Sequence, residues 1–343
     1  MYRFNVCDLN AIETRVGAWF SQCQALMDVF TPLPGLPNGR DPYLDFASRM
    51  YGVPYETLYH DLHNKQDKKK QAEAKFKRQM AKVGVLAAIY RQGGGGWGRS
   101  SDGYLDHTDD CPGGKHCGCP MVYDKVKTGL WNTAENMGVI MTQEEAHQIV
   151  RSFREAYLEI PACWKMLEDV VMDVLKGTNT VRRVGPGGCV TIDKINIEGC
   201  GALLRIQLPS GRYLHYLDAR IENCLMPWKD GDGNDVYREA LVYAGQNQKT
   251  DQWDIWVQSH GGKLFENIVQ GIARDILAVK LLEFEDREMP VVGHVHDEGI
   301  CLVPDDPFSP TVKDMVRIMS TPVDWAPGLL LGADGFEGSF YHK

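Results

Sequence analysis

Two acidic residues near opposite ends of this 343-residue chain could together bind divalent metal ions. Asp8 directly follows the short apolar run at residues 4–7, and Asp297 lies in a His-Asp-Glu tripeptide between two apolar, β-branched runs, 290–295 and 299–303. Two such runs joined by a tight turn predict a β-hairpin with Asp297 at its tip. If the strand before Asp8 lies in the same sheet, the two carboxylates could bind two Mg²⁺ ions, as phosphoryl transfer requires. The alternative for either acid alone is a simple turn cap.

A second group of residues recurs every four positions in a helical run that begins with the lysine-rich segment 67–70. These residues are Arg78, Lys82, Leu86 and Tyr90. Because an α-helix has about 3.6 residues per turn, positions four apart form one slowly drifting row. Two cations followed by an apolar side chain and a ring have the polarity of a nucleoside triphosphate, with the phosphates at the cations. The alternative is a basic solvated face that grades into a core face.

A third segment, residues 261–277, has the spacing of a helix with one buried and one polar row. The buried row is Leu264, Ile268, Ile272 and Ile276, and the polar row is Lys263, Asn267, Gln270 and Arg274. The polar side chains are suited to phosphates, sugars and minor-groove base edges. A plain solvated face is the alternative for this helix too.

The elements that must position these residues predict an α+β chain with an antiparallel sheet. A helix is expected to begin near Asn10, a residue type favoured at N-caps. Further helices are expected at 42–51, 65–91 and 142–176, and further strands at 190–197, 203–208 and 213–217.

The segments, in this order, resemble the family A (DNA polymerase I-like) DNA polymerases, and most closely their bacteriophage members. The pattern Asp8-x-x-x-Ile12-Glu13-x-Arg15 is similar to the first polymerase motif, Arg78-x-x-x-Lys82 through Tyr90 to the fingers helix, and His296-Asp297-Glu298 to the third motif. The bacteriophage character comes from three shorter motifs, Asp41-Pro42-Tyr43, Leu208-Pro209-Ser210-Gly211-Arg212 and Gly261-Gly262-Lys263.

The resemblance implies the right-hand architecture of a polymerase, with a palm built on an antiparallel sheet and helical fingers. It places a first palm segment at 1–20, the fingers at 21–190 with a Gly/Cys-rich insertion at 93–120, and a second palm segment at 191–343. Family members carry a thumb, and usually an exonuclease domain, before the first motif. We expect both to be absent from this chain and a separately encoded chain to supply them; the alternative is a truncated start of the sequence.

The resemblance also implies a template-directed DNA polymerase that uses two Mg²⁺ ions, primer-template DNA and dNTPs. In the reaction, a primer 3′-hydroxyl attacks the α-phosphate of a dNTP and pyrophosphate leaves. Asp8 and Asp297 would bind metal with the Leu9 carbonyl, and Glu298 would support them as a third carboxylate. The nucleotide-binding residues would be Glu13 as the steric gate against a ribose 2′-OH, Arg78 and Lys82 at the triphosphate, and Tyr90 near the templating base. Gln270 and His296 would contact the primer terminus, and Lys263, Asn267 and Arg274 are further DNA-binding candidates.

Two positions depart from the family pattern. Leu86 stands where the family usually has Phe or Tyr on the fingers helix, which removes a ring that packs on the incoming sugar. We therefore expect weaker discrimination around the 3′ position. Tyr43 stands where many cellular relatives have a His near the triphosphate. The resemblance leaves the role of this tyrosine open.

The composition agrees with a globular chain of one or two domains. Hydrophobic residues make up 43% of the sequence, enough for a substantial core.

The net charge of −9 is unexpected for a DNA-binding protein, but basic residues are concentrated between Lys65 and Lys82, where they could guide DNA locally. The first residues are not a signal peptide and no apolar run has membrane-spanning length, so a cytoplasmic location is expected, that of the bacterial host if the chain is phage-encoded.

Ten cysteines without a secretion signal indicate reduced thiols. A cluster of possible soft-metal ligands comprises His107, Cys111, His116, Cys117 and Cys119. These ligand types occur in zinc knuckles, but the usual Cys-x-x-Cys spacing is missing, so a structural Zn²⁺ and free thiols in an irregular loop both stay open. The cluster follows a glycine run at 93–98, which is expected to be a hinge.

Two readings from other functional classes stay open. A single-subunit RNA polymerase shares the same palm, although Glu13 in the steric-gate position favours deoxyribose. A non-catalytic DNA-binding replication subunit is the other reading. A scaffold has no need for Asp8, Asp297, Arg78 and Lys82 together, which favours a catalytic protein.

Overall fold

The protein folds into two compact units, described here from a computed structural model. The structure describes residues 2–95, 97–99, 104–105, 121–122, 125–178, 180–199, 201–232, 234–246, 252–253 and 255–341. Unit 1 combines residues 1–42 with 157–343, and unit 2 comprises residues 43–156. Both unit boundaries fall inside the segment 21–190 expected to form the fingers, and those functional domain limits stay a prediction.

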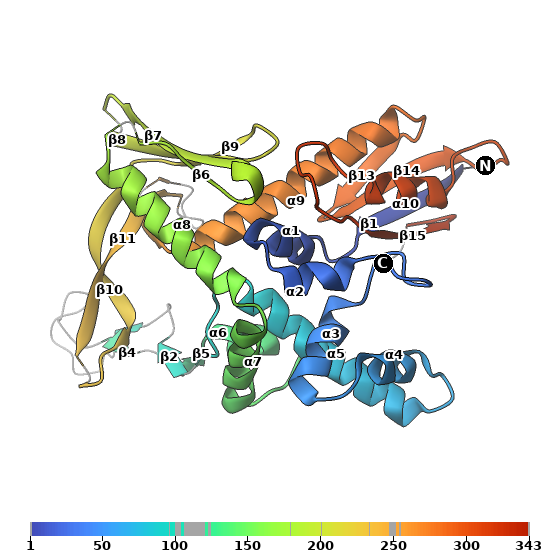
Figure 1. Ribbon diagram of the computed structural model, residues 1–343, viewed down its shortest axis with the longest axis horizontal. Helices are drawn as coiled ribbons and strands as arrows, with labels where there is room; N and C mark the ends of the chain where they lie inside the picture. Colours follow the sequence, from blue (N-terminus) through green and yellow to red (C-terminus); the bar gives the residue numbers. More distant parts are fainter. Residues whose placement is uncertain are drawn as a thin grey trace. The chain divides into compact units, whose positions relative to one another are not determined.

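Unit 1 contains a four-stranded antiparallel sheet in the order β13-β14-β1-β15 (Figure 1). The strands are β1 (Tyr2–Leu9), β13 (Val291–Val295), β14 (Glu298–Pro304) and β15 (Ala333–Gly338). Both ends of the sequence therefore contribute to one sheet, with the first strand between two strands from the last 50 or so residues. The expected hairpin and its pairing with the first strand are present.

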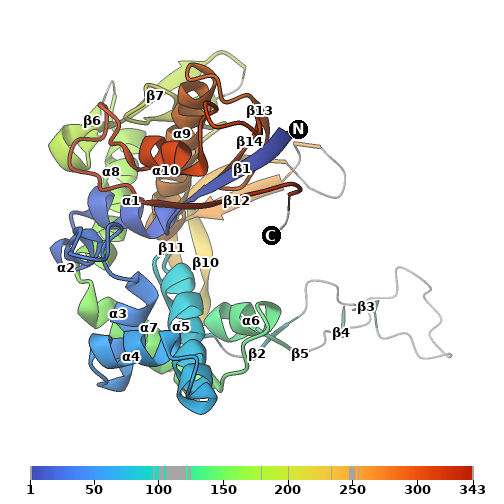
Figure 2. The ribbon, with the colours of Figure 1, turned by 90° about the vertical axis from the view of Figure 1, so that its right-hand side faces the viewer.

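Two helices cover one face of this sheet, α9 (Gly261–Glu285) and α10 (Val312–Ser320). Small residues allow their close approach. A Cβ atom on Gly299 would lie 3.0 Å from the ring of Phe284 in α9, and one on Gly335 would lie 2.7 Å from Val312 in α10. Because successive strand residues point to opposite faces, Asp8, Glu298 and Asp334 belong to the other face, which we call the open face. Figure 2 shows both helices beside β1.

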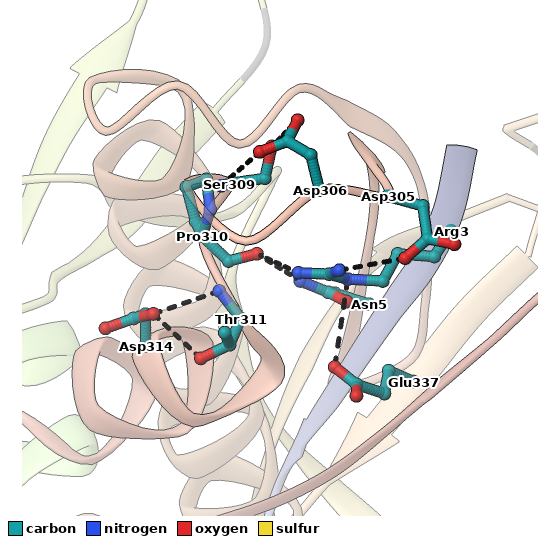
Figure 3. A network of polar contacts seen from close by, with 9 residues as sticks. All are labelled: Arg3, Asn5, Asp305, Asp306, Ser309, Pro310, Thr311, Asp314 and Glu337. Carbon is teal, nitrogen blue, oxygen red and sulfur yellow. Dashed lines mark hydrogen bonds and ion pairs between the residues drawn. The ribbon is translucent and has the colours of Figure 1, made fainter. Parts of the chain in front are cut away.

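A network of polar contacts ties the first half of β1 to the connection between β14 and α10 (Figure 3). The carbonyl oxygen of Pro310 accepts hydrogen bonds from Arg3 Nη2 at 3.2 Å and from Asn5 Nδ2 at 3.0 Å. Arg3 Nη1 also donates to Asp305 at 3.1 Å. Asn5 is fully buried, so these bonds satisfy a donor that would otherwise be costly in the core. They fix the strand whose end carries Asp8.

The first helix begins two residues later than expected. Helix α1 (Ile12–Ser21) is preceded by Ala11, in the left-handed conformation with φ 49°, and no side chain caps its N-terminus. The expected N-cap role of Asn10 is therefore wrong. Its side chain instead donates to Asp334 Oδ2 at 3.0 Å. A short helix, α2 (Gln24–Met27), and the 3₁₀ turn η1 (Asp28–Phe30) follow.

The segment 142–176, expected to be helical, forms two helices that fall in different units. Helix α7 (Gln143–Ala156) ends unit 2, and α8 (Glu159–Lys176) returns the chain to unit 1. Pro161 explains the division, because proline lacks the N–H donor that a helix interior requires and is tolerated in the first turn.

Two further antiparallel sheets belong to unit 1. One has the order β6-β7-β8-β9 and contains the three strands expected from sequence; the other has the order β10-β11-β12 and was not expected. The first is formed by β6 (Arg182–Val184), β7 (Val190–Ile197), β8 (Gly201–Gln207) and β9 (Tyr213–Tyr216), with the 3₁₀ turn η3 (Pro186–Gly188) between β6 and β7. The second is formed by β10 (Arg220–Lys229), β11 (Asp235–Gly245) and β12 (Ile255–Ser259).

The turn at residues 208–212 docks on helix α9. Arg212 Nε donates to Asp275 Oδ1 at 2.6 Å and Ser210 Oγ donates to Asp275 Oδ2 at 2.5 Å. Arg212 Nη2 also donates to the Gly271 carbonyl at 3.0 Å. A Cβ atom on Gly271 would lie only 2.8 Å from Leu208 Cδ1, so glycine here allows the turn to pack closely without a shift of Leu208. The motif that marked the bacteriophage character thus braces the helix that carries Gln270.

Unit 2 is a helical body. Its helices are α3 (Pro42–Tyr51), which begins at the unit boundary, α4 (Tyr55–His63), α5 (Lys68–Ala88), α6 (Gly129–Asn136) and α7. Gly84 lets α5 approach α7, because a Cβ atom there would lie 2.3 Å from Ile149 Cγ2. Four short strands pair two by two, β2 (Trp97–Arg99) with β5 (Lys125–Lys127) and β3 (Tyr104–Leu105) with β4 (Met121–Val122).

The described part of the glycine run is docked on neighbouring elements. The carbonyls of Gly93 and Gly94 accept hydrogen bonds from the backbone of α6 at 2.8 and 3.1 Å, and His147 Nε2 lies 2.9 Å from the Gly95 carbonyl. The expected hinge stays a prediction. At Gly95 the absence of a side chain serves close packing, since a Cβ atom there would overlap the Thr128 carbonyl. His107, Cys111, His116, Cys117 and Cys119 lie outside the described residues. Across the described ranges, none of the helices combines the length and apolarity needed to cross a bilayer.

Candidate active site

Asp8 lies on the open face near the end of β1, between two other acidic residues. In the sheet register Asp8 pairs with Glu298 on β14 and with Asp334 on β15. All three side chains therefore point to the same face of neighbouring strands. With Asp297 they form what we call the carboxylate cluster.

Asp297 is brought to Asp8 by the hairpin turn. Val295 pairs with Glu298, so His296 and Asp297 make a two-residue turn, and His296 has the positive φ of 53° expected at the first position of a primed turn. The Leu9 backbone N–H donates to the Asp297 carbonyl at 3.1 Å. The two residues singled out from opposite ends of the chain are thus neighbours.

The electrostatics of the carboxylate cluster at Asp8 are dominated by repulsion between like charges. The pKa of Asp8 is raised, first by desolvation and then by repulsion from Asp297, Asp334 and Glu298, although the residue is exposed at the strand end. A divalent cation would remove this repulsion, which makes the donor set fit for Mg²⁺. Among the described residues no three His, Cys, Asp or Glu side chains converge to hold a metal by themselves. A site on Asp8 and Asp297 would thus draw further ligands from backbone, such as the Leu9 carbonyl, from substrate and from water.

Glu298 differs from the other three acids because it is buried, with 5% of its surface exposed. The Tyr341 hydroxyl donates to Glu298 Oε1 at 2.9 Å, and this bond raises the pKa of the tyrosine. Glu298 is thus a buried neighbour of Asp8 in the sheet, and its orientation is fixed by Tyr341.

Asp334 is a member of the cluster that sequence reasoning missed. Two amides hold it: Asn10 Nδ2 donates to its Oδ2 at 3.0 Å, and Asn38 Nδ2 lies 3.4 Å from its Oδ1. The only local signal is an Asp-Gly pair after an apolar run, and such a pair is typical of many turns. Its pairing with β1 joins residues more than 320 positions apart, which no local pattern predicts.

Arg15, the last residue of the first motif, clamps the backbone that follows Asp8 and Leu9. It is 2% exposed, and its guanidinium donates to the carbonyls of Asn10 at 2.7 Å, Asn38 at 2.7 Å and Leu330 at 3.1 Å. Burial lowers its pKa to about 10, against the opposing effect of Asp334. The side chain thus joins the start of α1 to the segment before β15.

Glu13, the expected steric gate, lies in the first turn of α1 and is half-buried. A carboxylate in a first turn is favoured by the helix dipole. It stands five residues after Asp8 and two before Arg15, so the clamp of Arg15 also fixes the backbone that presents Glu13.

In unit 2, the expected row of Arg78, Lys82, Leu86 and Tyr90 is half-buried along its whole length. The first three lie in α5, and Tyr90 lies in the turn beyond it. Tyr43 joins this row: its ring centroid lies 5.4 Å from the Arg78 guanidinium carbon and 5.8 Å from Lys82 Nζ. The tyrosine whose role was left open thus contacts both expected phosphate-binding cations.

Two residues of the polar row on α9 are exposed, as expected, and the other two contact side chains of unit 1. Gln270 and Arg274 are exposed, as is His296 at the hairpin tip. Lys263 Nζ pairs with Glu266 at 3.0 Å, and Asn267 Nδ2 donates to the Tyr216 hydroxyl at 3.0 Å. The buried row of Leu264, Ile268, Ile272 and Ile276 is confirmed. Gly261 allows α9 to start against α8, where a Cβ atom would overlap the Trp164 carbonyl.

The sequence of this chain is 29% identical to a DNA polymerase of Bacillus phage SP02 over 341 residues, which is 99% of this chain and 41% of the relative. This chain resembles a bacteriophage DNA polymerase. The resemblance expected from the motifs is thereby confirmed, and it covers nearly every residue of the chain. The chain spans about two fifths of the length of that relative.

The chain was also compared with protein-family models and with solved structures. No protein-family model matches the sequence. Among solved structures, the polymerase domain of Pol1 from M. smegmatis, in complex with a DNA primer-template and dNTP, aligns with a TM-score of 0.45 and 13% identity, covering 98% of this chain and 39% of that one. The α+β class with antiparallel sheets and a helical second unit is confirmed by the elements themselves.

Proposed function

We propose that this chain is the palm and fingers portion of a template-directed DNA polymerase that adds dNMPs to a primer 3′-hydroxyl by two-metal-ion phosphoryl transfer. The observation that carries the proposal is the meeting of Asp8 and Asp297 at the open face of one sheet, with Leu9 N–H bonded to the Asp297 carbonyl at 3.1 Å. The phage DNA polymerase that matches 99% of the chain supports the same conclusion.

In this proposal Asp8, Asp297 and the Leu9 carbonyl hold the metal ions, and Glu298 supports them from its buried position. Bound Mg²⁺ would neutralise the charge that builds up on the phosphate oxygens and lower the pKa of the attacking hydroxyl. The protein contributes positioning: the network of Arg3 and Asn5 fixes β1, and the Arg15 clamp fixes the backbone after Leu9.

The nucleotide is held in the proposal by the row on α5. Arg78 and Lys82 bind the triphosphate, Leu86 and Tyr90 lie toward the sugar and base, and Glu13 excludes a ribose 2′-hydroxyl. The primer side is bound by Gln270 and His296, with Lys263, Asn267 and Arg274 as further DNA contacts. Arg212 and Ser210 hold α9 through Asp275, which keeps this DNA-binding helix in register.

Primer extension tests the proposal. A labelled primer-template is incubated with Mg²⁺, dNTPs and either the wild type, Asp297→Ala, or the matched control Asp324→Ala, which removes an exposed carboxylate of the same unit. We expect extension by the wild type and the control and a loss of at least about a thousandfold in Asp297→Ala, because charge neutralisation at the reacting phosphate depends on it. Extension by all three proteins would overturn the assignment of Asp297.

The same assay separates the DNA polymerase from its RNA-synthesising alternative. The wild type is expected to prefer dNTPs over NTPs strongly, and Glu13→Ala is expected to accept NTPs more readily while it still extends with dNTPs. Equal use of both sugars by the wild type would contradict the steric-gate role. A separate chain that supplies thumb and exonuclease stays a prediction, and size-exclusion chromatography of the native protein tests it.

A further inference from the structure

We infer that Tyr43 is a positioning residue of the nucleotide site, whose ring holds the Arg78 guanidinium and the Lys82 ammonium at a fixed spacing before the triphosphate arrives. The inference rests on the proposed function and goes beyond it. It assigns a physical role to the residue that replaces the histidine of many cellular relatives, and this role belongs to the ring and not to the hydroxyl.

The contacts come from two helices of unit 2. Tyr43 is the second residue of α3 and is 7% exposed, while Arg78 and Lys82 lie one turn apart on α5 and are half-buried. Both cations lie within the range of about 6 Å over which the face of an aromatic ring attracts a positive charge. One buried ring therefore contacts both cations of the row.

Two like charges four residues apart on a helix repel each other and weaken the helix. Both side chains are also long, so each loses rotamer freedom when it binds a phosphate. The ring opposes both effects, because its negative face attracts each cation and restricts where each can lie. The triphosphate then meets two cations that are already placed, which improves binding by lowering the cost of ordering them.

The ring itself is held by the packing of α3. Phe46, one turn further along the same helix, is fully buried and packs edge-to-face against Phe153 of α7, with ring centroids 5.9 Å apart. Asp45 and Arg49 form an ion pair at 2.9 Å along the same helix. These contacts fix the start of α3 and with it the position of Tyr43.

A series of substitutions that changes only the electron density of the ring tests the inference. Tyr43 is replaced by Phe and by mono-, di- and trifluorinated Phe, which keep the shape of the ring while they progressively weaken its attraction for cations. Tyr43→Phe, which keeps an unsubstituted ring, is the reference for the series. Across the fluorinated series KM for dNTP should rise stepwise, by about threefold to fivefold at the trifluorinated ring, with kcat unchanged. Isothermal titration of dNTP should show the same trend in Kd.

A matched control comes from the same pair of helices. The ring centroid of Tyr51 lies 5.5 Å from Lys77 Nζ, a contact of the same kind, but Lys77 lies outside the row and pairs with Glu73 at 2.6 Å. The same fluorinated series at Tyr51 should leave both KM and Kd unchanged. A flat series at Tyr43, or equal slopes at Tyr43 and Tyr51, overturns the inference.

The outcome is distinct from that of the proposed function. A wild type that extends primers but gives a flat Tyr43 series defeats the positioning role alone. A wild type that extends no primer defeats the proposed function, and the titration series then decides separately whether the ring controls binding of the triphosphate.

Discussion

At the scale of single residues, the repulsion within the carboxylate cluster gives a prediction for Asp8. Replacing Asp8 with Asn removes one of four clustered acids, so we expect activity to be lost while the metal-free protein becomes more stable at pH 7. The gain should not exceed about 1 kcal/mol, because Asp8 is exposed and solvent screens the repulsion. Thermal unfolding in the presence of a chelator measures it.

The pH dependence of this gain follows from the raised pKa of Asp8. An acid whose pKa is higher in the folded state binds more protons there, so it lowers stability once the pH exceeds its unfolded value near 3.8. The difference between Asp8→Asn and the wild type should therefore vanish at about pH 3 and be complete at pH 7. Asp324→Asn serves as the control and should show no such pattern. Added Mg²⁺ should reverse the order of stability, since only the wild type gains from binding it.

Leu86 is the second residue whose identity predicts a measurable property. It is half-buried in the row on α5, at the position where the family resemblance led us to expect a ring against the incoming sugar. Leu86→Phe should change the ratio of dideoxy-NTP to dNTP incorporation by about tenfold, a change of about 1.4 kcal/mol in relative transition-state binding. Single-nucleotide incorporation with the two substrates gives the ratio. An unchanged ratio would show that residue 86 does not affect discrimination between a 3′-hydroxyl and a 3′-hydrogen.

At the scale of elements, the docking of the 208–212 turn on α9 gives a prediction for Gly271→Ala. The added methyl would lie 2.8 Å from Leu208 Cδ1 and 3.3 Å from Arg212 Nη2, so the Leu208 side chain must shift. We expect a loss of about 1–3 kcal/mol in the free energy of unfolding, measured by denaturant titration. In a double-mutant cycle, Leu208→Ala should recover part of this loss, because it removes the side chain that the new methyl meets. Strict additivity would show that the contact is not the cause.

Many of these helices and strands could be predicted from the sequence, because neighbouring residues determine them. The hairpin around Asp297 follows from two β-branched runs and a short turn, and α9 follows from apolar residues at helical spacing. The division between α7 and α8 was missed although Pro161 marks it. The cap of α1 was wrong because Asn10 bonds to Asp334, a residue that only the folded sheet brings near.

The site residues that could not be predicted are those brought together by strands far apart in the sequence. Asp8 and Asp297 were paired by their shared position at strand ends, a pattern that recurs in metal-dependent sites. Asp334, Asn38 and Tyr341 carry no such pattern, and they enter the site only because β15 and the residues after it lie beside β1 and β14. The role of Arg15 could not be predicted either, because two of the carbonyls that it binds belong to residues distant in the sequence.

At the scale of the whole molecule, the charge distribution sets how this chain could meet DNA. The net charge is −9, yet Lys68, Lys69 and Lys70 form the exposed first turn of α5. Cations at a helix N-terminus are disfavoured by the helix dipole. The Asp67 cap, whose Oδ1 accepts from the Lys70 N–H at 3.1 Å, partly opposes this effect. Because these three lysines lower the stability of α5, we expect them to contribute to DNA binding.

This expectation can be measured by replacing all three lysines with Gln. Each phosphate contact contributes about one unit to the slope of log K against log salt, so the slope for primer-template binding should fall by about two to three. The helix should become slightly more stable, and the incorporation rate at saturating DNA should not change. A control that changes Lys165, Lys176 and Lys313 to Gln removes the same total charge elsewhere, and it should leave the slope unaltered. If both triple variants lose affinity equally, overall charge governs the encounter with DNA, and the lysines of α5 have no special place in it.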